Sequence, residues 1–154
     1  MLALFQFNET SPAAAGTAVS SVAVNGSDST TAGICSGRLD EMLGLSLIGE
    51  LVGATGGVLD VYVQAEFLGQ WYDVAHFPQL SAGGAAITTV FTLGAKAAAD
   101  AVIGKATSPV LAAGTCAGLW GDQLRLVMVA GTSTSVGAAV KVTVVGQLPS
   151  TTRS

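Results

Sequence analysis

Residues 58–77 have the sequence VLDVYVQAEFLGQWYDVAHF, and this stretch decides the fold class. Apolar residues alternate with Asp, Gln and Glu as far as Phe67, which is the two-residue period of a β-strand with one buried face. The tripeptide Leu-Gly-Gln follows, and the alternation resumes from Trp71 to Phe77. Two strands joined by so short a connection predict a β-hairpin within an all-β domain.

The register of this hairpin decides which side chains are buried. A two-residue loop at Gly69-Gln70 pairs Phe67 with Tyr72 and places Glu66 opposite Asp73. A three-residue loop that begins one residue earlier would instead put Asp73 in the core. Because burying an unpaired carboxylate costs several kcal/mol, we favour the two-residue loop.

That register leaves large aromatic side chains on the outer face of the hairpin. Tyr62, Trp71 and Phe77 would form a patch that a monomer rarely leaves exposed. Either another part of the same chain covers the patch, namely the N-terminal segment or the insertion Gly94–Ala106, or a second subunit does. We favour a second subunit, and we therefore predict that these three residues belong to a protein interface.

Alternation with a period of two extends over most of the chain, and glycine-rich loops separate the alternating segments. The predicted strands are Thr17–Asn25, Leu45–Val52, Val58–Leu68, Trp71–Phe77, Ala86–Leu93, Gln123–Ala130 and Ala138–Gly146. Weaker candidates lie near Gly33–Ser36 and Thr115–Leu119. We expect Leu45–Phe67 and Gln123–Gly146 to be hairpins, and Gly94–Ala106 has the composition of a short inserted helix.

The fold class predicted from these segments is all-β. We expect a single antiparallel β-sandwich, jelly-roll or immunoglobulin-like, with about seven to nine strands. The order Cys35, Trp71, Cys116 does not fit true immunoglobulin domains, in which the Trp follows the first Cys closely. The sandwich would span residues 17–147, with an extended N-terminal arm at 1–16 and a short C-terminal tail at 148–154.

Composition limits the possible partners. Charged residues make up 10% of the 154 residues, where about 25% is usual for a soluble domain. The six basic residues are scattered, which argues against nucleic-acid binding. Mean hydropathy is +0.60, but no apolar run approaches the roughly 20 residues of a membrane span. So few charges favour a surface that is covered in a permanent assembly.

The N-terminal segment MLALFQFNETSPAAAG lacks the positive region of a signal peptide, so we expect an extended arm. At about 3.3 Å per residue it would reach roughly 50 Å, far enough to lie along a neighbouring subunit. Its candidate interface residues are Leu2, Leu4, Phe5 and Phe7. Without an export signal, Cys35 and Cys116 are predicted to be free thiols in a reducing cytoplasm.

Catalysis is not predicted. His76 is the single histidine, and the sequence leaves open a Cys–His pair with Cys35 or Cys116. Glu66 and Asp73 could be paired carboxylates, but adjacent acids on a hairpin are usually only solvated. Two cysteines and one histidine do not make a usual zinc site, so we expect neither a metal nor a cofactor.

Three segments together resemble small structural proteins of tailed-phage virions. They are a glycine turn followed by VLDVYVQ at 58–64, WYDVAHF at 71–77, and LRLVMVAG at 124–131. The resemblance covers about Leu45–Gly146, and Gly56–Phe77 carries most of it. The short Leu-Gly-Gln connection replaces the longer Asp-Gly loop of these proteins. The resemblance implies a virion component, assembled in the host cytoplasm.

From the resemblance, the low charge and the aromatic patch we predict a capsid cement or decoration protein. Its partners would be the major capsid protein and copies of itself, with no nucleic acid and no membrane. One alternative is a head–tail connector or tail subunit. Another is a carbohydrate-binding fibre or spike domain that uses Trp71, Tyr72 and Trp120 as sugar platforms.

Overall fold

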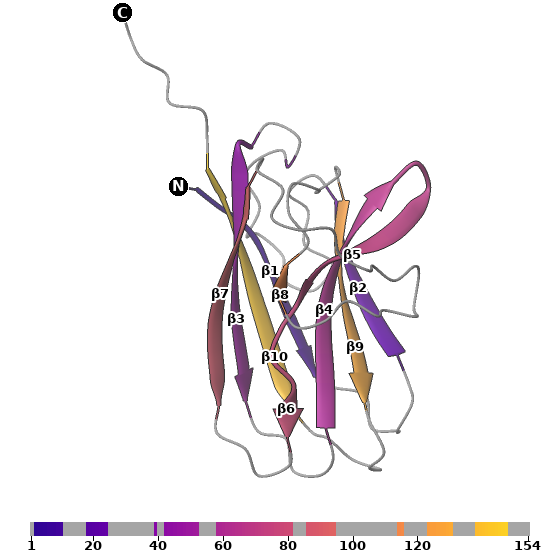
Figure 1. Cartoon of the computed structure of the whole chain (residues 1–154), viewed down its shortest axis with the longest axis vertical. Helices are drawn as coiled ribbons and strands as arrows, with labels where there is room; N and C mark the ends of the chain where they lie inside the picture. The colour runs from indigo at the N-terminus through magenta and orange to yellow at the C-terminus, as the bar shows by residue number, and fades with distance from the viewer. Residues whose placement is uncertain are drawn as a thin grey trace, which may run out of the picture.

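A computed structural model describes residues 2–10, 18–24, 39, 42–52, 58–81, 86–94, 114–115, 123–130 and 138–147 of the chain. These residues form two antiparallel sheets, so the predicted all-β sandwich is confirmed (Figure 1). Within the described residues, no helix has the length and apolar character needed to cross a membrane. The predicted helix beyond Gly94, both cysteines, Trp120 and the tail 148–154 lie outside the described residues.

In the described parts of the chain, ten strands make up the two sheets. Sheet A contains, in spatial order, β1 (Leu2–Thr10), β10 (Ala139–Gln147), β3 (Gly44–Val52) and β7 (Ile87–Gly94). Sheet B contains, in spatial order, β2 (Ala18–Val24), β9 (Gln123–Ala130), β4 (Val58–Phe67), β5 (Gln70–His76) and β8 (Gly114–Thr115), and β6 (Leu80–Ser81) pairs with β4.

The eight longer strands have the order of a jelly roll. The chain passes from one sheet to the other at each connection between long strands, except between β4 and β5, which are neighbours in sheet B. This gives β1-β10-β3-β7 in one sheet and β2-β9-β4-β5 in the other. Of the two sandwich types that the sequence leaves open, the jelly roll is therefore the one observed.

Two predicted hairpins are wrong. Leu45–Phe67 contains β3 and β4, which lie in opposite sheets, and Gln123–Gly146 contains β9 and β10, which also lie in opposite sheets. Each of these strands has one apolar face, and that face is buried equally well when the chain folds back within a sheet or crosses to the other one. Alternation and loop composition therefore do not distinguish the two connections.

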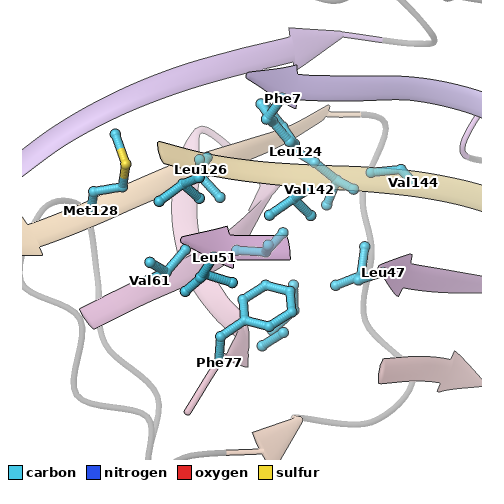
Figure 2. Close-up of a cluster of buried hydrophobic side chains, with 14 of the residues drawn as sticks. Phe7, Leu47, Leu51, Val61, Phe77, Leu124, Leu126, Met128, Val142 and Val144 are labelled. Atoms are coloured by element: carbon cyan, nitrogen blue, oxygen red, sulfur yellow. The ribbon is translucent and has the colours of Figure 1, made fainter. Parts of the chain in front are cut away.

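The core fills the space between the sheets. Every second residue of β3, β4, β9 and β10 points inward, and Figure 2 shows side chains from both sheets converging on one apolar cluster. Its largest fully buried members are Phe7, Leu39, Leu45, Leu47, Leu51, Leu59, Phe77, Leu80 and Leu124. Ile87 and Phe91 of β7 are partly buried and pack against the edge of this cluster.

The predicted N-terminal arm is largely a strand of the sandwich. Leu2–Thr10 pairs with β10 of its own chain, with a bulge between Ala3 and Phe5. Phe7 lies opposite Val142 and is fully buried, so it is a core residue and not a contact for a neighbour. The alternation of Phe and polar residues in FQFN, residues 5–8, is the strand signal that the assignment to an arm overlooked.

Neither predicted register of the β4–β5 hairpin is observed. The loop is Leu68-Gly69, so that Phe67 pairs with Gln70. Both loop residues have positive φ, 52° and 76°, which is the geometry of a type I′ turn. A bulge farther along leaves Val74 without a partner across the strands. The prediction failed because it placed Gly69 at the first position of the two-residue loop and because it contained no bulge.

Candidate functional site

A row of buried polar side chains crosses the outer face of sheet B. The register places Gln64 of β4 between Asp73 of β5 and Arg125 of β9. Gln64 Nε2 donates to Asp73 Oδ1 at 2.7 Å, and Arg125 Nε donates to Gln64 Oε1 at 2.7 Å. Gln64 and Asp73 are fully buried, and Arg125 is 8% exposed. The amide of Gln64 therefore links a buried cation to a buried anion.

Arg125 also contacts the aromatic ring of Trp71. Its guanidinium carbon lies 4.6 Å from the ring centroid, within the range of a cation–π interaction. Burial lowers the pKa of Arg125, and the negative charge of Asp73 opposes that shift. Among the described side chains, Arg125 Nη2 is buried without a hydrogen-bond partner. An unsatisfied donor of this kind costs about 1–3 kcal/mol, which the contact with Trp71 partly offsets.

A second polar cluster lies farther along β4 and β5. His76 Nε2 lies 3.2 Å from Asp60 Oδ1, and Gln79 Nε2 donates to both oxygens of the same carboxylate, at 3.0 and 3.1 Å. The hydrogen bond with His76 is the main reason that the pKa of Asp60 lies below its usual value, while burial acts in the opposite direction. The cluster therefore favours an ionised Asp60.

Tyr62 stacks on His76. The two ring centroids are 4.0 Å apart and the planes meet at 17°. Burial, followed by the charge of Asp60, raises the pKa of Tyr62 to about 12, so the phenol stays neutral at physiological pH. This pairing of an Asp with a His resembles the orienting half of a catalytic triad. The stacked tyrosine nevertheless covers one face of the imidazole, and His76 is only 9% exposed.

The predicted pair of carboxylates is not formed. Glu66 lies opposite Trp71, and Asp73 lies opposite Gln64, so the two acids are not cross-strand partners. Glu66 Oε1 accepts a hydrogen bond from the backbone N–H of Gly69 and thereby supports the turn. Among the described residues, no group of three or more His, Cys, Asp or Glu side chains could hold a metal ion.

The outer face of sheet A contains an open pocket of about 570 Å³. A row of four side chains crosses the four strands here: Asn8 of β1, Lys141 of β10, Glu50 of β3 and Thr88 of β7. The pocket is lined by these four residues and by Val52, Ala139 and Val140. Lys141 Nζ lies 2.5 Å from Glu50 Oε2, and both side chains are 43% exposed.

The rest of this face is nearly free of charge. Exposed Val90 lies between Thr88 and Thr92 on this face, and Gln6 Nε2 donates to Thr143 Oγ1 at 2.6 Å. The two sheets therefore differ in their outer faces. The described part of sheet B has a buried polar row, whereas the described outer face of sheet A carries a pocket and few charges.

The three aromatics of the predicted interface patch do not lie together. Phe77 is fully buried in the core, where its ring centroid lies 5.0 Å from that of Phe91. Tyr62 is 8% exposed, and Trp71 is half-buried beside Arg125. The expected placement of Phe77 on the outer face is wrong, because the bulge at Val74 changes the phase of the strand. The side chains of Leu2, Leu4 and Phe5 lie outside the described set.

Trp71 and Tyr72 do not form a joint sugar platform. Trp71 pairs with Glu66 on the outer face of sheet B, whereas Tyr72 pairs with core-facing Ala65 and so points to the opposite side. Tyr72 instead packs near Phe67, with the ring centroids 6.3 Å apart.

Sequence reasoning missed the partnership of Gln64 with Arg125 and the pocket on sheet A. Gln64 interrupts the apolar strand VYVQAEF, and Arg125 interrupts the apolar strand LRLVMVA. These interruptions were the available sequence signal for a buried polar pair. Their pairing depends on β9 lying beside β4, and no local pattern specifies that neighbour.

No protein-family model matches the chain, and searches of curated proteins and of solved structures found no significant similarity.

Proposed function

We propose that this chain is a structural protein of a tailed-phage virion and that it acts as a cement or decoration protein on the capsid shell. The jelly-roll strand order is the observation that best supports the proposal, because jelly rolls recur in viral capsid proteins. The resemblance of residues 56–77 to small virion proteins points in the same direction. Because one fold hosts many functions, the proposal also needs a specific binding surface.

The outer face of sheet A is the surface that we assign to the major capsid protein. Val52 and Val90 are 50% and 59% exposed on this face, and the pocket between the strands lies beside Val52. A sparsely charged face with a pocket suits a partner that inserts an apolar side chain, with hydrogen bonds around it. The Lys141–Glu50 ion pair forms part of the polar rim of that pocket.

Copy number in purified particles tests the proposed role. Quantitative mass spectrometry of purified particles of the phage that encodes the chain should find it in several hundred copies, and cryo-electron microscopy should place it on the outside of the shell. A small ring of copies at the neck would instead support a head–tail connector. Absence from the particle would overturn the virion assignment.

The carbohydrate-binding alternative also fits a jelly roll, since lectin domains share this architecture. It has less support from the side chains, because Trp71 and Tyr72 point to opposite faces of sheet B. A glycan array with the purified chain distinguishes the two roles. Specific sugar binding that is lost in Trp71→Ala would favour the fibre domain.

The proposed function requires no catalytic step. The Asp60–His76 pair is the arrangement most similar to catalytic machinery, and Tyr62 stacks directly upon it. We assign this cluster a structural role, which His76→Gln tests. Loss of stability without a change in particle binding is the expected result.

A further inference from the structure

We propose that β7 pairs with β7 of a second copy of this chain, so that two four-stranded sheets join into one continuous sheet. The inference concerns the edge of sheet A and does not depend on the virion role. It would hold for any function of the protein, because it rests on the chemistry of one strand and on the geometry of a two-fold axis.

Within the residues that the structure describes, β7 is an edge strand, and its own sequence has none of the usual protection. Its neighbour in sheet A is β3, and Figure 1 shows it at the outer margin of the sheet. Every second residue of an edge strand points its N–H and C=O groups away from the sheet, which makes a template for another strand. Natural edge strands are usually interrupted by a charge, a proline or a bulge. The sequence ITTVFTLG has no charge and no proline, and β7 pairs with β3 without a register shift.

The opposite edge of the same sheet is protected. β1 contains Glu9 and has a bulge between Ala3 and Phe5. A charge and a bulge both hinder the addition of a further strand. The contrast between the two edges of one sheet favours β7 as the edge at which sheet A is extended.

Antiparallel pairing of β7 with itself has a self-complementary register. With the two-fold axis at Val90, that valine faces Val90 of the partner subunit, and Thr88 faces Thr92 of the partner subunit. These are apolar and Thr–Thr pairs of the kind that stabilise antiparallel strands, and no like charges meet. Because Ile48 is the neighbour of Val90 on β3, the pairing creates an unbroken stripe of β-branched side chains across both copies.

The core-facing side of β7 also favours a second copy of β7 as its partner. Ile87 and Phe91 are only partly buried at the open edge of the core, although Phe91 packs against Phe77. In the proposed register, Phe91 lies opposite Thr89 of the partner subunit. Pairing would thus cover the exposed edge of Phe91 and extend both cores toward each other.

Sedimentation of the full chain over a range of concentrations tests the inference. The wild-type chain should sediment with twice the 15.2 kDa mass of one chain. The variant Thr88→Lys with Thr92→Lys places lysine opposite lysine twice and should weaken the dimer by at least about tenfold. The variant Thr88→Lys with Thr92→Glu places lysine opposite glutamate at the same two positions and should remain dimeric. Ala139→Lys adds an exposed charge elsewhere on the same face and should also remain dimeric.

Circular dichroism of every variant checks that the sandwich is folded. A wild-type monomer at high concentration would overturn the inference, as would equal dimerisation of the two Thr88/Thr92 variants. A closed trimer would also overturn it, because self-pairing of β7 ends at two copies. Failure of the dimer in solution leaves the particle assay unaffected, so the two proposals can fail separately.

Discussion

At the scale of single residues, Gly49 is fixed by the ring that lies against it. A Cβ at this position would fall against the ring of Phe77, 2.8 Å from both Cδ1 and Cζ. Phe77 is fully buried between the sheets, where close packing opposes a shift of its ring. Glycine therefore permits the close approach of β3 to this aromatic residue.

Gly49→Ala should lower the free energy of unfolding by about 1–3 kcal/mol, the usual cost of overpacking a core. Urea unfolding measures the change. Ser46→Ala, on the outer face of the same strand, should change stability by less than about 0.5 kcal/mol. Combining Gly49→Ala with Phe77→Leu should recover part of the loss, and no recovery would show that the ring is not the cause.

Asp60 makes stability depend on acid pH. Its pKa is lowered in the folded protein, chiefly by the hydrogen bond with His76, so the folded state holds this proton less tightly than the unfolded state. The contribution is complete well above the ordinary pKa of 3.8 and is lost as the pH falls through that value and below it. Asp60→Asn should therefore lose less stability than the wild type between pH 5 and pH 3. Urea unfolding of both proteins at several pH values measures the free energy of unfolding. An equal loss of stability in the two proteins would contradict the prediction.

At the scale of elements, the tip of the β4–β5 hairpin holds a leucine in an unfavourable conformation. Leu68 has φ of 52° and is fully exposed, so its side chain makes little compensating contact. Left-handed backbone costs an ordinary residue about 1–2 kcal/mol. Type I′ turns prefer Asn-Gly, and Gly69 already occupies the second position.

Leu68→Asn should raise the free energy of unfolding by about 1 kcal/mol. Gly69→Ala is the matched control, because φ is 76° there and open space surrounds the position, so strain alone would act. That substitution should be destabilising by a similar amount. Thermal or urea unfolding measures both, and a destabilised Leu68→Asn protein would argue against the type I′ turn.

The strands were largely predictable from sequence, but their partners were not. Gln123–Ala130 was predicted with its observed bounds, because apolar residues occupy nearly every position of LRLVMVA. The crossing of the chain from β3 to β4 had no local signal, since either connection buries Leu47 and Val61. The buried row of Gln64, Asp73 and Arg125 depends on β9 lying beside β4 and on the Leu68-Gly69 loop, which sets Asp73 opposite Gln64, so it could not be predicted from local patterns.

At the scale of the whole molecule, two exposed apolar residues give a test of where a shell partner binds. Val52 lines the pocket of sheet A and is 50% exposed, whereas Leu43 is 55% exposed and is not among the pocket residues. Each can be changed to aspartate with little effect on folding, because neither is buried. The pair therefore separates loss of a binding surface from loss of the fold.

Val52→Asp should weaken binding to purified capsids by about tenfold or more, because it places a charge in the apolar part of the pocket. Leu43→Asp should bind as the wild type does. Co-sedimentation with capsids lacking the chain measures both. Equal binding by the two variants would remove the pocket from the proposed interface.

Deletion of residues 1–16 would not test the interface alone, because it removes β1 and Phe7 from the fold.

The position of β10 has a consequence for synthesis on the ribosome. This strand lies between β1 and β3 in sheet A, and β9 lies between β2 and β4 in sheet B, yet both are made after the other strands. Neither sheet can close until these strands have left the exit tunnel. Until then, the nascent chain must carry several apolar, weakly charged strands without their central partners. We expect that translation pauses or truncations before β9 produce chains that depend on chaperones or aggregate.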